Sequence, residues 1–176
     1  MDKLLGCFIN EPGREFHVRQ LAKLLKKSPT TISKYLKELE KEKLLISKRE
    51  YNHLFFRANT ESKYFRERKL FFNIRLLRDS RLIEFLEEVF NCPQAIVLFG
   101  SFGKAENIKE SDIDILVITP IKKDVNLEKY ERKLGHKIQL FLHSTQEIER
   151  MKIKNKELLN NFINGKILEG FWEVIK

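Results

Sequence analysis

The chain has 176 residues, of which 42% are hydrophobic and 34% are charged, a composition typical of folded globular proteins and unlike that of disordered chains. It has neither an apolar run of the roughly 18 residues that a membrane helix needs nor a signal peptide, so we expect a cytoplasmic protein without a membrane partner. Cys7 and Cys92 form no CxxC pair, which argues against a disulfide framework or a zinc site, and we expect both to be buried.

The net charge of +9 is distributed unevenly along the chain. Residues 1–78 contain 19 Lys and Arg against 9 Asp and Glu, whereas residues 79–176 contain 15 against 16. Because neutralisation of phosphates by basic side chains dominates nucleic-acid affinity, this asymmetry favours a polyanion as the partner of the first segment. A basic face that only contacts solvent is the alternative, and charge alone does not separate the two.

Apolar periodicity and turn residues predict three helices and two strands in the first segment, at residues 4–9, 18–25 and 29–43 for the helices and 44–47 and 53–57 for the strands. Ser28 is placed to cap the third helix, and Pro29 suits its first position. Ile32, Leu36 and Leu39 form a buried stripe on this helix. The opposite side is polar and is free to contact a partner.

Two helices joined by a tight turn and followed by a hairpin are similar to the winged helix-turn-helix regulators of the MarR and ArsR type. The resemblance covers about 55 residues of the segment 1–59 and implies double-stranded DNA as a partner, read in the major groove by the second of the two helices. It implies base or groove contacts for Thr30, Thr31, Ser33, Lys34 and Lys37, and phosphate contacts for Lys48 and Arg49. A protein-protein or dimerisation module is the alternative use of such a fold.

Residues 60–90 are predicted to be a helical connector, with helices at 61–78 and 82–90. Phe65, Phe72 and Leu76 lie along one side of the first helix. This apolar side is broad, so we expect packing within the chain, with packing against a second copy in a homodimer as the alternative.

A buried strand is predicted at residues 95–99, followed by the turn Gly100-Ser101. Gly100 lets the backbone approach a phosphate, and Ser101 adds a hydroxyl at the start of the next helix. A second strand is predicted at residues 111–118, where alternation places Asp112 and Asp114 on one face. Two carboxylates held so close favour a divalent cation between them.

The stretch LFGSFGKAENIKESDIDILV resembles the signature of the DNA polymerase beta nucleotidyltransferase superfamily, and most closely its minimal bacterial and archaeal members. The resemblance implies transfer of a nucleoside monophosphate from an NTP to a hydroxyl of a protein, an RNA or a small molecule. It implies Mg²⁺ as the cofactor, held by Asp112 and Asp114 as catalytic residues. Gly100 and Ser101 would bind the nucleotide phosphates, and Lys104 stands where many relatives have Arg.

The third acid of that family is missing at the expected place. The predicted strand at residues 137–142 has Gln139 there, and an amide cannot accept the acceptor's proton. Unless Glu128, Glu131 or another acid substitutes for it, catalysis should be slow or absent while nucleotide binding persists. Two functions therefore remain open: a nucleotidyltransferase, and a DNA-binding transcriptional regulator whose second domain senses nucleotide.

The rest of the chain is predicted to be two helices at residues 144–152 and 156–163 and a short strand at 166–169, with Trp172 in the core. Ser144 and Glu147 are spaced as a capping box that starts the first of these helices. The predicted fold is α+β: a winged helix-turn-helix domain (1–59), the connector (60–90) and a nucleotidyltransferase-like α/β domain with a mixed sheet (91–176). The minimal nucleotidyltransferases that it resembles occur in toxin-antitoxin systems, which implies a partner toxin protein.

Overall fold

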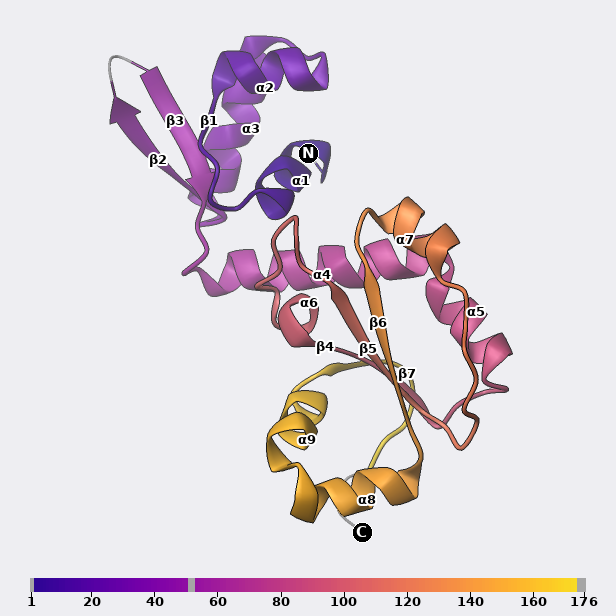
Figure 1. The fold of residues 1–176 in the computed structure, drawn as a ribbon. Helices are drawn as coiled ribbons and strands as arrows, with labels where there is room; N and C mark the ends of the chain where they lie inside the picture. The colour runs from indigo at the N-terminus through magenta and orange to yellow at the C-terminus, as the bar shows by residue number, and fades with distance from the viewer. Residues whose placement is uncertain (1, 51–52, 174–176) are drawn as a thin grey trace. The chain divides into compact units, whose positions relative to one another are not determined.

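The computed structural model describes residues 2–50 and 53–173 and divides the chain into two compact units, Met1–Lys69 and Leu70–Lys176. The division falls inside a single helix, α4 (Lys63–Ser80), so no loop separates the two units at this point (Figure 1). Among the described residues, no helix has both the length and the apolar composition required to cross a bilayer.

The N-terminal unit combines helices with a small antiparallel sheet, whose strand order is β1-β3-β2. Its elements before α4 are α1 (Asp2–Asn10), β1 (Phe16–His17), α2 (Val18–Leu25), α3 (Pro29–Lys41), β2 (Leu45–Glu50) and β3 (His53–Ala58). Each of the predicted helices and strands of this segment is present, with small differences at the ends.

The start of α3 forms as the sequence predicts. The Ser28 hydroxyl accepts a hydrogen bond from the Thr31 amide at 3.1 Å, and Pro29 is the first helical residue. Ile32, Leu36 and Leu39 are at most 1% exposed, which confirms the buried stripe. The helix ends at Lys41 rather than at residue 43, because Lys43 adopts a left-handed conformation with φ of 60°.

The hairpin strands are longer than predicted at the outer end of β2. Lys48 and Arg49 lie within β2, opposite Phe55 and Leu54 of β3, and not in the connecting turn. Residues 51 and 52, which fall between the two predicted strands, lie outside the described residues. Pairing with β3 extends β2 over these basic residues, and this pairing could not be predicted from the local sequence pattern.

The C-terminal unit contains a four-stranded mixed sheet, in agreement with the predicted fold class. Its elements after α4 are α5 (Leu82–Val89), β4 (Ala95–Phe99), α6 (Gly100–Lys104), β5 (Ile113–Ile118), α7 (Glu128–Leu134), β6 (Ile138–His143), α8 (Thr145–Lys154), α9 (Lys156–Ile163) and β7 (Lys166–Gly170). The strand order is β6-β5-β4-β7, with β5 and β6 parallel and the other pairs antiparallel.

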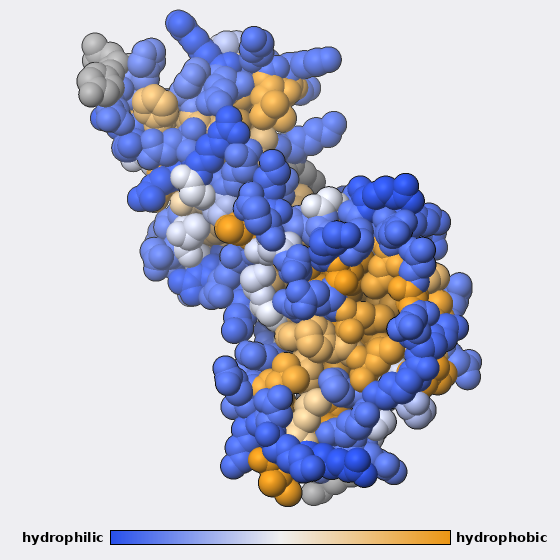
Figure 2. Space-filling view, viewed as in Figure 1, coloured by the Kyte–Doolittle hydropathy of each residue, from blue (hydrophilic) through white to orange (hydrophobic). Residues whose placement is uncertain are grey.

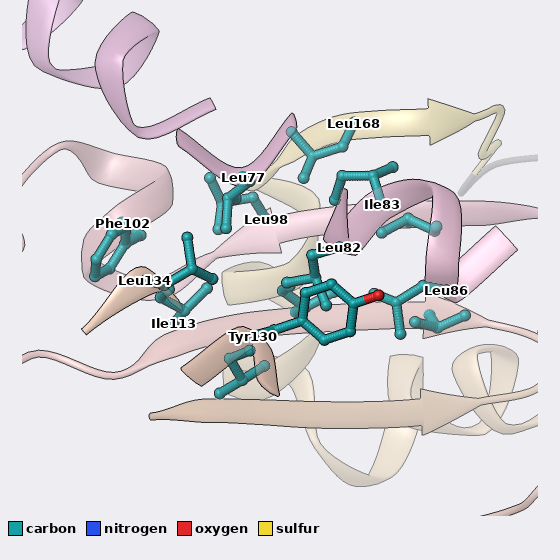
Figure 3. Close-up of a cluster of buried hydrophobic side chains, with 14 of the residues drawn as sticks. Leu77, Leu82, Ile83, Leu86, Leu98, Phe102, Ile113, Tyr130, Leu134 and Leu168 are labelled. Carbon is teal, nitrogen blue, oxygen red and sulfur yellow. The ribbon is translucent and has the colours of Figure 1, made fainter. Parts of the chain in front are cut away.

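Each face of this sheet has its own apolar layer, because side chains alternate between the faces along a strand. On one face, Ile113 and Ile115 of β5 pack with α5, Phe102 and Tyr130 (Figure 3). On the other face, strand residues pack with α8 and α9, where Phe162 is fully buried. Figure 2 shows apolar side chains gathered on the C-terminal unit over β5 and β6, between α7 and α8.

The buried face of α4 differs from the predicted one. Of the predicted Phe65, Phe72 and Leu76, Phe65 is buried, whereas Phe72 and Leu76 are half-buried and the neighbouring Phe71 is 60% exposed. The buried positions follow each other at helical spacing and include polar residues: Phe65, Lys69, Asn73, Leu77 and Ser80. Burial lowers the pKa of Lys69 to about 8. Apolar residues alone were therefore an incomplete guide to the face of α4 that packs.

Three further predictions about the C-terminal unit can be compared with the structure. The capping box of Ser144 and Glu147 is present at the start of α8, and Trp172 is partly buried against the core. Burial of the cysteines was wrong, because Cys92 is exposed and Cys7 is half-buried. Cys92 follows α5 in a left-handed turn with φ of 54°, which places it at the surface.

Candidate nucleotide site

The turn at the end of β4 is shaped by glycines. Gly100 has φ of +62°, a conformation that favours glycine, and a Cβ at this position would overlap the Asp114 carboxylate. A Cβ on Gly103 would lie 2.7 Å from the Leu98 carbonyl oxygen, so α6 packs closely on the strand that precedes it. The Gly100-Ser101 turn and Asp114 are therefore in direct contact.

Asp112 and Asp114 stand at the start of β5. The strand begins at Ile113, two residues later than predicted, so Asp112 immediately precedes it and Asp114 is its second residue. Asp114 is in register with Phe99, the last residue of β4. Ile113 and Ile115 are fully buried on the opposite face, and both aspartates remain half-buried. The alternation predicted from the sequence is present.

The two carboxylates interact unfavourably without a cation. Burial, and secondly the negative charge of Asp112, raise the pKa of Asp114 above its usual range. A divalent cation shared by the two side chains would remove this repulsion, and carboxylate oxygens are its preferred protein ligands. Among the described residues, no group of three or more His, Cys, Asp and Glu side chains is arranged to hold a metal ion. The aspartate pair fits a cation whose remaining ligands come from water or phosphate.

Gln139 lies beside the aspartate pair, on the parallel neighbour strand β6. It is in register with Asp114, and its Nε2 donates a hydrogen bond to Asp112 Oδ2 at 2.7 Å. One carboxylate oxygen of Asp112 therefore already accepts a hydrogen bond from the Gln139 amide. At the position where the resemblance implied a third acid, the chain has a neutral side chain that bonds to Asp112.

Glu128 and Glu131, the acids considered as substitutes for the third acid, line a pocket whose lining does not include the two aspartates. Glu131 accepts a hydrogen bond from the Ile138 amide at 3.0 Å and pairs with Lys137 at 3.1 Å, and these interactions lower its pKa. Glu128 and Glu131 line a pocket of about 390 Å³ together with Arg132, Gly135, His136 and Lys137. Glu131 is therefore engaged with the start of β6 and with Lys137.

The other residues expected to bind nucleotide flank the turn. Ser101 is half-buried, and its carbonyl oxygen accepts a hydrogen bond from the Glu106 amide at 2.8 Å. Lys104 is exposed at the end of α6. Gly100, which contacts Asp114, is thus followed within α6 by a half-buried hydroxyl at Ser101 and an exposed ammonium group at Lys104.

The residues expected to bind DNA are less uniform than the sequence implied. Thr30, Lys34, Lys37 and Arg49 are exposed, and Ser33 is half-buried. Thr31 is half-buried, and its hydroxyl hydrogen-bonds the Ser28 hydroxyl at 2.8 Å. Lys48 forms ion pairs with Glu15 at 2.9 Å and Glu50 at 3.1 Å, and these contacts raise its pKa. The charge of Lys48 is therefore already partly neutralised.

The comparison with known families agrees with this geometry. A family model described as "Nucleotidyltransferase domain" matches residues 79–168. The matched segment contains β4, α6, β5 and β6, the elements that place the turn, the aspartates and Gln139. No curated protein matches the chain. Because the match spans just over half of the sequence, the chain belongs to the nucleotidyltransferase domain family.

Proposed function

We propose that the C-terminal unit is a Mg²⁺-dependent nucleotidyltransferase of the minimal type, which moves a nucleoside monophosphate from an NTP to a hydroxyl of a protein, an RNA or a small molecule. The observation that carries the proposal is the contact between the Gly100 turn and the Asp114 carboxylate, with Asp112 alongside. Because Gly100 has no side chain, a metal-bound triphosphate could approach the backbone of the turn next to the two acids.

Each residue has a definite task in this proposal. Asp112 and Asp114 would hold Mg²⁺, which when bound neutralises phosphate charge and lowers the pKa of an acceptor hydroxyl. Gly100 admits the phosphates close to the backbone, and Ser101 donates its hydroxyl to them. Lys104 supplies a positive charge at the end of α6. Asp112 also keeps Gln139 in place through their hydrogen bond.

Nucleotide sensing without transfer is the second candidate, and Gln139 is the observation that favours it. Its amide cannot take a proton from an acceptor hydroxyl, and it donates to Asp112. A site of this kind can bind Mg·NTP while transferring nucleotide slowly or not at all. The C-terminal unit would then regulate what the N-terminal unit does.

Two measurements separate these candidates. Isothermal titration should detect binding of Mg·NTP by the wild type and loss of binding in Asp112→Asn with Asp114→Asn; equal affinities would dismiss the nucleotide site. Incubation with radiolabelled NTPs and cell extract should label a macromolecule if the chain is a transferase. Binding without label would favour the sensor, and Gln139→Glu should then introduce or accelerate transfer by adding the missing carboxylate.

For the N-terminal unit we propose a winged helix-turn-helix domain (residues 1–59) that binds double-stranded DNA, linked through residues 60–90 to the nucleotidyltransferase domain (91–176). The arrangement α2-turn-α3 followed by the β2-β3 hairpin supports it, as does the basic excess of this segment. Such a fusion suits a regulator of its own operon, with a toxin protein as a further partner in a toxin-antitoxin system.

The DNA-binding proposal is tested by gel-shift titration of duplex DNA at several salt concentrations. Combined replacement of Lys34, Lys37, Lys48 and Arg49 by Ala should abolish salt-dependent binding, because these side chains would neutralise phosphates. Unchanged affinity would instead favour a protein-protein module. Sedimentation of the wild type would show whether a homodimer binds the DNA.

A further inference from the structure

Asn73 is a buried polar residue of α4 whose contacts lead directly to the candidate nucleotide site. It is 1% exposed and lies in the C-terminal unit. Its Nδ2 donates two hydrogen bonds, to the Phe102 carbonyl oxygen at 3.0 Å and to Asn107 Oδ1 at 2.8 Å. Both amide hydrogens of the side chain are therefore used on residues that are 29 and 34 positions away in the sequence.

The two acceptors lie in the segment that joins the glycine turn to the aspartate pair. Phe102 is the third residue of α6, two positions after Gly100, and its side chain is fully buried. Asn107, itself only 6% exposed, follows the end of α6 in the loop that leads to Asp112. Asn73 thus ties α4 to both α6 and the loop that follows it.

Further hydrogen bonds also hold this segment, and some of them lie within it. The Glu106 amide donates to the Ser101 carbonyl at 2.8 Å, and the Ile108 amide donates to the Ser111 hydroxyl at 2.9 Å. At its far end, His136 Nδ1 donates to the Ser111 carbonyl at 2.8 Å. Asn73 anchors the near end from α4, as His136 anchors the far end from the approach to β6.

We propose that Asn73 is a positioning residue for nucleotide binding: it fixes α6 and the following loop so that the Gly100-Ser101 turn and Asp112 keep the spacing that a metal-bound triphosphate needs. The inference rests on the proposed nucleotide site. Buried hydrogen bonds suit this task, because replacing Asn73 by a side chain without donors removes two bonds that join α4 to α6 and to the loop.

A purely structural role would destabilise the unit without changing the site, and a second buried polar residue of α4 provides the matched control. Ser80 is 5% exposed, donates to the Leu77 carbonyl at 2.6 Å and accepts from the Leu82 amide at 3.2 Å. Its bonds remain between α4 and the start of α5. Ser80→Ala therefore removes buried hydrogen bonds from the same helix without touching α6.

The test compares Asn73→Leu, which is similar in size but has no donor, with Ser80→Ala. Isothermal titration with each of the four Mg·NTPs should show affinity reduced about tenfold in Asn73→Leu and unchanged in Ser80→Ala, although both variants melt at a lower temperature. Duplex DNA binding should be retained by both. Equal NTP affinity of wild type and Asn73→Leu, or equal losses in the two variants, would overturn the inference.

Hydrogen-deuterium exchange of residues 101–112 gives a second readout that does not depend on nucleotide. Exchange in this segment should accelerate in Asn73→Leu and stay at the wild-type rate in Ser80→Ala. If the wild type binds no NTP, the proposed nucleotide site fails, and the exchange result alone decides whether Asn73 holds the turn. Unchanged exchange of the segment in Asn73→Leu would contradict the inference.

Discussion

The two units carry their candidate functions in opposite ways. In the N-terminal unit, most of the residues expected to contact DNA are exposed side chains of α3 and β2, although Lys48 is paired with Glu15 and Glu50. In the C-terminal unit, the candidate site depends on close backbone packing at Gly100 and on half-buried charges at Asp112 and Asp114. Steric substitutions should therefore be severe in the second unit, whereas charge substitutions should act additively and with salt dependence in the first.

The largest effect is expected for Gly100→Ala. The added methyl group would overlap the Asp114 carboxylate, so nucleotide affinity should fall by about a hundredfold or more, with a melting temperature lower by several degrees. Titration calorimetry and thermal unfolding measure the two effects. Gly135→Ala is the control, because Gly135 has φ of +74° but open space around it. Alanine at this position would meet no steric overlap and would be destabilised only by its left-handed backbone, by about 1 kcal/mol. Equal effects of the two variants would contradict the steric argument.

A smaller and graded effect is expected on DNA binding. Lys34→Ala with Lys37→Ala should weaken duplex binding about tenfold or more and reduce the slope of log affinity against log salt by about 2. Lys48→Ala should have less effect than either lysine of α3, because Glu15 and Glu50 already pair with Lys48. Gel shifts at several salt concentrations measure this order. A larger loss for Lys48→Ala would mean that DNA displaces its acidic partners.

A modest effect of pH on stability is expected at the start of α8. Hydrogen bonds from Lys122, and then from the Ser144 amide, lower the pKa of Glu147 to about 2. Its contribution to stability is complete above its ordinary pKa of 4.5 and is lost as the pH falls toward 2. Glu147→Gln keeps an acceptor for the cap but removes the charge, so its melting temperature should be lower than that of the wild type at pH 7.

Thermal unfolding of wild type and Glu147→Gln between pH 7 and pH 2 measures this dependence. The two curves should converge at the acidic end, where Glu147 becomes protonated. A constant difference over the whole range would assign the effect to packing instead of charge.

The smallest effect is expected for Asp114→Asn in the absence of metal and nucleotide. Because burial and the charge of Asp112 raise the pKa of Asp114, folding disfavours its ionised form relative to the unfolded chain. The neutral amide should raise the melting temperature by about 1–3 °C while the variant loses nucleotide binding. The gain should shrink at lower pH, where the wild-type carboxyl takes up a proton. A lower melting temperature would mean that Asp114 stabilises the turn.

Local signals predicted most elements of both units because caps, periodicity and turn residues act over a few positions. Ser28 and Pro29 begin α3, and Ser144 with Glu147 begins α8, as the sequence indicates. The acid-apolar-acid pattern likewise placed Asp112 and Asp114 on one face. What could not be predicted depends on partners distant in sequence: Glu15 beside Lys48 requires the assembled sheet, and Asn73 meets acceptors about thirty residues away.

The position of the boundary between the units has a practical consequence. Residues 69 and 70 are consecutive positions of one helix, whose backbone groups are hydrogen-bonded along its length. Proteases cleave exposed, irregular segments, so limited digestion should leave this junction intact. Fragments made for separate expression should keep α4 whole in one of the two pieces, because ending a fragment at the boundary would expose a freshly cut helix end.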